Sequence, residues 1–198
     1  MKRETWNVVM LAGLLGAVLV WSLATGAAPA SMTMAQRGEY LVKTGACGDC
    51  HTPMKMGANG PEPDMTRYLS GHPQMLMMPP APKLEPGPWL GTFAATMTAW
   101  AGPWGVSFTA NLTPDKETGL GKWTEQTFVD TIRSGRVMGK GRPILPPMPY
   151  EAMRNSTDDD LKAIFAYLAT IPVIVNKIPE PVPPPAMPKT ADMPPMGH

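Results

Sequence analysis

Residues 46–53 read Ala-Cys-Gly-Asp-Cys-His-Thr-Pro (ACGDCHTP), and they hold both cysteines of the 198-residue chain. Two cysteines at this spacing are compatible with three chemistries. A structural zinc site needs four ligands, usually with a second close Cys or His pair, whereas the other histidines, His72 and His198, stand alone. A thioredoxin-like dithiol needs a βαβ setting with the motif at a helix N-terminus. Here the motif instead follows a predicted helical stretch that ends at Gly45.

The third chemistry is covalent attachment of haem c, and it uses every residue of the motif. Cys47 and Cys50 would add through sulfur to the two haem vinyl groups, and the adjacent His51 would be presented to the iron. No thiol of the chain is left over. The C-x-x-C-H pattern therefore favours one covalently bound haem c over zinc binding or dithiol exchange.

The first 30 residues have the pattern of an export signal. Met-Lys-Arg-Glu is followed by an uncharged run from Trp6 to Leu23 and then by small residues up to Ala30. The ending Ala28-Pro29-Ala30 fits a cleavage site, but the apolar run also reaches the lower limit for a membrane span. We expect an exported, periplasmic domain that residues 6–23 anchor to the inner membrane, with a cleaved signal peptide as the alternative.

The remaining chain is enough for one domain, at 31–177, followed by a proline-rich and extended tail at 178–198. The chain has 17 Lys+Arg and 16 Asp+Glu, and removing Lys2, Arg3 and Glu4 leaves 15 of each. A neutral domain offers no basic field for nucleic acid. The equal numbers of basic and acidic residues also fit a fixed subunit better than a diffusing carrier that is steered to its partner by charge.

Three helices are predicted around the motif. The first spans about 35–46. The second begins at a cap at Thr124 and ends at Gly135, and the third begins at hydroxyl caps at 156–157 and ends at Pro172. Thr33 and Gln36 form a capping box for the first. The third has acidic residues in its first turn and apolar residues at helical spacing.

The combined pattern resembles the class I cytochrome c fold: a helix with a glycine and an aromatic residue, C-x-x-C-H, a methionine in a proline-flanked loop, and a C-terminal amphipathic helix. More narrowly, RGEYLVKTGACGDCHTP, YLSGHP, NLTPDKETGLGKW and MPYEAMRNSTDDDLKAIFAYL resemble the cytochrome c subunits of membrane-bound bacterial dehydrogenases. The resemblance covers about 37–179. It implies an all-α, cytochrome c-like domain around one haem, with a long irregular insertion at 54–108 and a possible N-terminal transmembrane helix. Those subunits often carry several haem domains, whereas this chain has one motif.

Met148, in ILPPMPY, is the predicted sixth iron ligand. It lies 97 residues beyond His51 (148 − 51 = 97), and prolines on both sides restrict its loop. The resemblance places the axial methionine at the same point. His72, in SGHP, is the alternative ligand, and an open sixth position is the other alternative.

The resemblance also places residues around NLTP, and the tryptophan that follows, near the haem propionates. This suggests Asn111 and Trp123 as hydrogen-bond donors to the propionates. Trp123 is equally a candidate for a hydrophobic staple on Phe128 at the start of its helix.

Iron with strong-field ligands on both faces leaves no site for substrate, so the sequence predicts a one-electron carrier rather than an enzyme. The expected partners are redox proteins: a membrane dehydrogenase, a quinol-oxidising complex or a terminal oxidase. The alternative is a haem c protein with an open or labile sixth ligand that acts as a small-ligand sensor or an enzyme.

Overall fold

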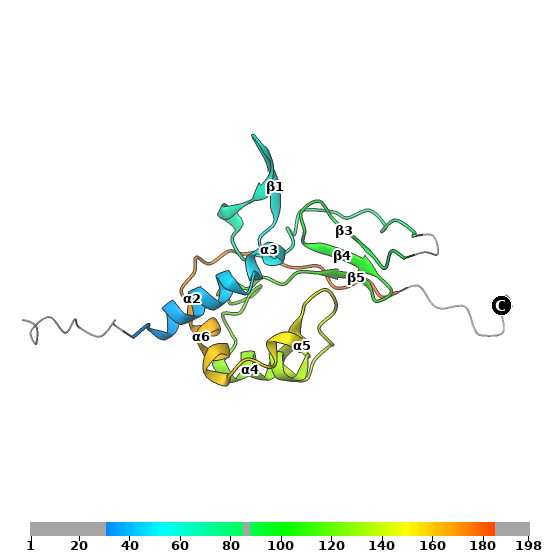
Figure 1. Ribbon diagram of the computed structural model, residues 1–198. Helices are drawn as coiled ribbons and strands as arrows, with labels where there is room; N and C mark the ends of the chain where they lie inside the picture. Colours follow the sequence, from blue (N-terminus) through cyan, green and yellow to red (C-terminus); the bar gives the residue numbers. More distant parts are fainter. Residues whose placement is uncertain (1–30, 85–87, 185–198) are drawn as a thin grey trace, which may run out of the picture. The chain divides into compact units, whose positions relative to one another are not determined.

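The computed structural model describes residues 31–84 and 88–184 (Figure 1). The longer helices are α2 (Met34–Thr44), α4 (Glu125–Ser134) and α6 (Asp158–Leu168), and the short ones are α3 (Cys47–His51) and α5 (Tyr150–Met153). The 3₁₀ turns are η1 (Met65–Arg67) and η2 (Val137–Gly139). The strands are β1 (Met54–Gly57), β2 (Gly60–Pro63), β3 (Thr92–Phe93), β4 (Ala99–Gly102) and β5 (Gly105–Phe108).

The expectation of an all-α domain is wrong, because the segment between α3 and α4 forms two antiparallel sheets. β1 and β2 make a hairpin, and β3, β4 and β5 make a three-stranded sheet in that order. Both sheets lie within 54–108, so this insertion is not wholly irregular. Its tight turns are built on glycine: Gly60 and Gly105 have φ angles of +117° and +91°, which side chains other than glycine rarely adopt.

The three predicted longer helices are confirmed at their caps. The Thr33–Gln36 capping box is present at the start of α2. The Thr124 hydroxyl accepts the N–H of Thr127 at the start of α4, and Gly135 ends that helix in the left-handed conformation. The Thr157 hydroxyl accepts the N–H of Asp160 in the first turn of α6. These ends were predictable because a helix cap depends on residues only three positions apart.

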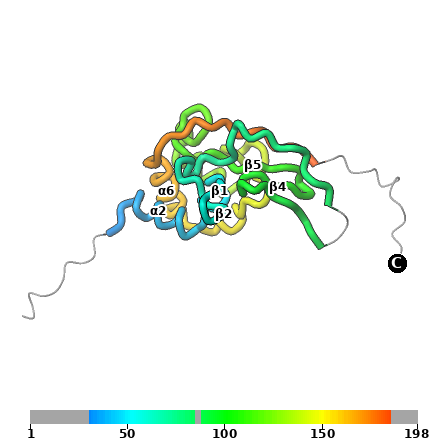
Figure 2. The backbone as a smooth tube through the Cα atoms, turned by 90° about the horizontal axis from the view of Figure 1, so that it is seen from above, coloured from blue at the N-terminus to red at the C-terminus, as the bar shows by residue number. Residues whose placement is uncertain are grey.

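Helices α2 and α6 lie side by side, as both views show (Figures 1 and 2). Gly38 makes this close approach possible: a Cβ there would overlap the carbonyl oxygen of Ala163 and lie 2.8 Å from Cβ of Tyr167. At the outer edge of the contact, Arg37 Nε pairs with Asp160 Oδ1 at 3.0 Å. The α2–α6 contact thus joins the helix that leads into the cysteine motif to the last helix of the fold.

The core lies between the helices and the loop before α4. Its buried apolar members come from α2, α4, α6 and the connecting loops: Val42, Leu69, Leu120, Phe128, Val129, Ile132, Leu161, Ile164, Leu168 and Ile171. Cys47 packs against the edge of this cluster, so the motif is set directly on the core.

Within residues 31–84 and 88–184, no helix has the length and apolar character that crossing a membrane would require. The predicted anchor at 6–23 and most of the predicted tail at 178–198 lie outside the described residues.

We predict that Gly38→Ala lowers the free energy of unfolding by about 2 to 4 kcal/mol, because the added methyl group forces α2 and α6 apart. Gly48→Ala in α3 is the matched control, since a Cβ there meets its nearest neighbours at an ordinary 3.6 Å. Denaturant unfolding of the purified proteins measures both. Equal stability of the Gly38 variant and wild type would contradict the close packing of the two helices.

Candidate haem site

The short helix α3 presents both cysteines and the histidine of the motif. Ala46 precedes it in a left-handed conformation, with φ 55°, and so turns the chain sharply between α2 and α3. Cys47 and Cys50 are three residues apart on this helix and therefore lie on one face. Both are free thiols, and burial raises the pKa of each, so they remain protonated at neutral pH.

His51 is buried, with 8% of its surface exposed, and its Nδ1 donates a hydrogen bond to the carbonyl oxygen of Ala110 at 2.8 Å. A carbonyl only accepts, so the proton must sit on Nδ1 and the lone pair on Nε2. Burial lowers the pKa of His51 and thereby favours the neutral ring. The structure thus holds the imidazole in the form that ligates iron. No hydrogen bond joins Nε2 to any residue within 31–84 or 88–184.

Two loops hold the backbone around His51 in place. The N–H of Gly71 donates to the carbonyl oxygen of His51 at 2.8 Å. The residue after His51 is also bonded: Thr52 Oγ1 accepts the N–H of Leu69 at 3.1 Å. The carbonyl oxygen of Leu69 in turn accepts the N–H of Leu112 at 2.9 Å. The loop at 69–72 therefore holds the backbone of His51, and the loop at 109–112 holds its ring.

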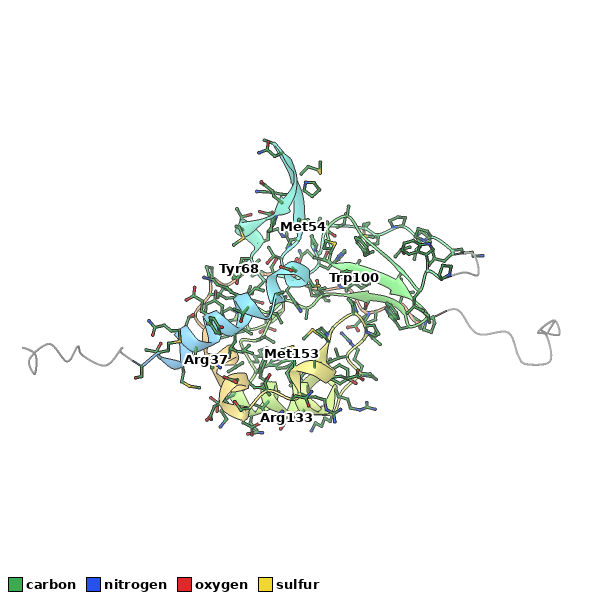
Figure 3. The ribbon with its side chains drawn as sticks, viewed as in Figure 1. Arg37, Met54, Tyr68, Trp100, Arg133 and Met153 are labelled. Atoms are coloured by element: carbon green, nitrogen blue, oxygen red, sulfur yellow. The ribbon has the colours of Figure 1, made fainter. Side chains whose placement is uncertain are left out.

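Met148 lies in the loop between η2 and α5. It is half-buried and packs against the core. Figure 1 shows this loop rising from α5 toward the sheet of β3, β4 and β5, where Ser107 Oγ donates to the carbonyl oxygen of Pro146 at 2.5 Å. Met153, on α5, also packs against the core (Figure 3).

His72, the alternative ligand, is committed to contacts within the protein. Its side chain is fully buried and lies against the ring of Phe108, with 4.8 Å between the ring centroids. Its Nδ1 bonds to Thr98 Oγ1 at 3.0 Å, and its Nε2 bonds to the carbonyl oxygen of Leu76 at 3.3 Å. With both ring nitrogens engaged, His72 serves as a structural residue in the sheet-facing loop.

Asn111 is an internal structural residue, and this differs from the propionate role that the resemblance suggested. It is 3% exposed. Its amide nitrogen donates to Ile174 O at 2.9 Å and to Thr118 Oγ1 at 3.2 Å, while its oxygen accepts from the backbone and hydroxyl of Thr113. These bonds use both of its polar atoms. Trp123 packs against the core cluster that contains Phe128, as a helix staple would.

Asn176 is the central residue that sequence reasoning missed. It lies fully buried in the segment 171–182, which we call the strap. Its amide nitrogen donates to the carbonyls of Ser70 at 2.6 Å and His72 at 2.9 Å, and its oxygen accepts from Arg67 and from the N–H of Gln74. A lone asparagine in VIVNKIP carries no pattern that would single it out. The strap thereby closes over the loop that holds the backbone of His51.

The strap ends on the sheet. Val182 pairs with Val106 of β5 through two backbone bonds of 2.8 and 2.9 Å. Gly105 allows this contact, because a Cβ there would overlap the carbonyl oxygen of Val182. The first residues of the predicted tail are therefore bound to the domain.

These residues fit a covalently held haem. The two thiols share a face of α3, the imidazole presents Nε2 and is fixed by Ala110, and a half-buried thioether stands in a loop bound to the sheet. Among the described residues there is no cluster of three or more His, Cys, Asp and Glu side chains that could hold a metal ion.

No family model matches the chain. A nicotinate dehydrogenase subunit of Pseudomonas putida is 30% identical in an alignment of 181 residues, which covers 84% of this chain and 12% of that protein. The fructose dehydrogenase cytochrome subunit of Gluconobacter japonicus is 29% identical over 134 residues, 68% of this chain and 20% of that one. The gluconate 2-dehydrogenase cytochrome c subunit of Pantoea cypripedii is 29% identical over 138 residues, 70% and 23% of the two chains.

This chain is homologous to cytochrome c subunits of dehydrogenases. It spans less than a quarter of the length of each of the three relatives just described. The similarity confirms the predicted resemblance, and the relatives that carry it are named as cytochrome subunits, not as catalytic subunits, of dehydrogenases. It also supports haem c as the cofactor.

We predict that Asn176→Ala lowers the free energy of unfolding by about 3 to 5 kcal/mol, since it leaves two carbonyls, the N–H of Gln74 and a contact of Arg67 without their partner inside the protein. Asn155→Ala is the matched control, because that amide makes one exposed hydrogen bond, to the carbonyl of Glu151. Denaturant unfolding of the two haem-loaded variants measures the difference. A loss no larger than that of the control would show that the strap does not stabilise the fold.

Proposed function

We propose that the chain is a monohaem c-type cytochrome that passes single electrons between redox proteins, as a subunit of a dehydrogenase complex or as its direct partner. Cys47 and Cys50 would hold the haem through thioether bonds, and His51 and Met148 would ligate its iron. When bound, the haem supplies a one-electron couple whose potential a methionine ligand raises. The remainder of the site tunes and protects this couple.

The hydrogen bond from His51 Nδ1 to Ala110 is the observation that carries the proposal. It fixes the tautomer, orients the ring and increases the basicity of Nε2. A histidine with a merely structural role would be expected to use both nitrogens within the protein, as His72 does. The contrast between the two histidines supports His51 as the ligand.

Met148 is the proposed sixth ligand because its loop is fixed at both ends. Pro146 accepts the Ser107 hydroxyl on one side. On the other, the carbonyl of Pro149 accepts the N–H groups of Ala152 and Met153 in α5. A restricted loop keeps a neutral thioether in place in both oxidation states, so little reorganisation accompanies electron transfer.

We also propose that the domain works on the periplasmic side of a bacterial inner membrane, with residues 6–23 as its anchor. The sequence pattern of the first 30 residues supports this location. Three redox partners fit it: a membrane dehydrogenase, a quinol-oxidising complex and a terminal oxidase. The names of the relatives favour the dehydrogenase.

We predict that Met148→Ala abolishes the weak long-wavelength absorption band of ferric iron–sulfur coordination and lowers the reduction potential, because the thioether favours ferrous iron. Met153→Ala is the control, since this methionine packs against the same core from α5 and its loss should change stability but not the band. Visible spectra of the purified proteins in both redox states, with a redox titration, measure these effects.

Two results would overturn the assignment. A wild-type spectrum without the band would argue for ligation by another residue or for an open position. Rapid binding of carbon monoxide to the reduced wild-type protein would support the open site and, with it, a small-ligand sensor or enzyme. A haem content other than one per chain would reject the monohaem proposal.

A further inference from the structure

Ser107 lies outside the haem ligands, yet its hydroxyl reaches the loop that carries Met148. It sits on β5, where it pairs with Trp100 of β4, and is 7% exposed. Its Oγ donates to the carbonyl oxygen of Pro146, 39 residues later in the chain, at 2.5 Å. We propose that Ser107 is a positioning residue that holds this loop closed and thereby keeps the Met148 sulfur on the iron. The inference rests on the proposed function, in which Met148 is the sixth ligand.

The loop has few backbone donors with which to fix itself. Pro146, Pro147 and Pro149 lack an N–H group, and the N–H of Met148 turns back to the carbonyl of Leu145 at 3.3 Å. Prolines restrict the shape of the loop but do not fasten it to the rest of the protein. The N–H of Ile144 fastens the start of the loop to the carbonyl of Gly135 at 2.8 Å, and the Ser107 hydroxyl joins the part nearer Met148 to the sheet.

The strand that carries Ser107 is itself held on both edges. β5 pairs with β4 from Ala99↔Phe108 to Gly102↔Gly105. Its other edge bonds to the strap at Val182, through Val106, which is next to Ser107 in the chain. The hydroxyl is therefore mounted on a backbone with little freedom to follow the loop, so the bond resists outward movement of Pro146 and of Met148 two residues later.

Removing the hydroxyl changes the balance between closed and open loop. Without the hydroxyl, the closed loop loses the bond that joins Pro146 to β5, whereas the open loop, in which that bond is already broken, loses nothing. The open fraction should therefore rise. Because an added ligand competes for the iron only when the sulfur has left, its apparent affinity rises in proportion to the open fraction.

Imidazole displacement of the sulfur in the ferric holoprotein tests the proposal. The titration follows the loss of the long-wavelength band in wild type, Ser107→Ala, Ser107→Thr and Ser134→Ala. Ser134 is the matched control, since its hydroxyl also donates to a backbone carbonyl, that of Asp130 at 2.7 Å, but at the surface of α4. We expect the apparent Kd for imidazole to fall about fivefold to tenfold in Ser107→Ala, and to stay near wild type in Ser107→Thr and Ser134→Ala.

Gly38→Ala separates positioning from general stability, because it weakens the α2–α6 contact without touching the loop. Its imidazole affinity should match wild type although its stability is lower. An unchanged Kd in Ser107→Ala, with the band present in wild type and lost in Met148→Ala, would overturn the inference and leave the proposed function standing. Absence of the band from wild type would overturn both.

Discussion

The hydrogen bond between His51 and the carbonyl of Ala110 is the constraint on which the candidate site depends. It connects residues 59 positions apart and requires the loop at 109–112 to lie against the end of α3. That loop in turn is held by Leu69 and by the side chain of Asn111, which reaches the strap. The orientation of one imidazole therefore depends on contacts from three distant parts of the chain.

The β-structured insertion acquires a physical role in this arrangement. Here the sheet of β3, β4 and β5 provides a buried hydroxyl at Ser107 and a paired edge for the strap. Strand β5 thus makes two contacts: the Ser107 side chain bonds to the loop before α5, and the Val106 backbone bonds to the end of the strap.

The helices were predictable from sequence and the sheets were not, for a reason visible in particular residues. The caps at Thr33, Thr124 and Thr157 act over three positions, so a local pattern reveals them. The strands are two to four residues long, and their pairing depends on contacts that no window of sequence contains. Asn59-Gly60 was a usable turn signal for the first hairpin.

In the candidate site, the motif predicted His51 as a ligand. The hydrogen bond from His51 to the backbone carbonyl of Ala110 could not be predicted, because any residue type has such a carbonyl. Asn111 was recognised as important for the wrong reason, because its amide is used entirely within the protein.

The position of Asn176 has a consequence for the order in which the protein matures. Cys47 and Cys50 lie near the start of the domain, whereas the residue that closes the loop behind His51 lies 126 positions after Cys50 (176 − 50 = 126). A chain synthesised from its N-terminus therefore exposes both thiols well before Asn176 exists to complete the fold. If the proposed haem is attached to this open chain, the last residues of the domain would then close a site that already holds it.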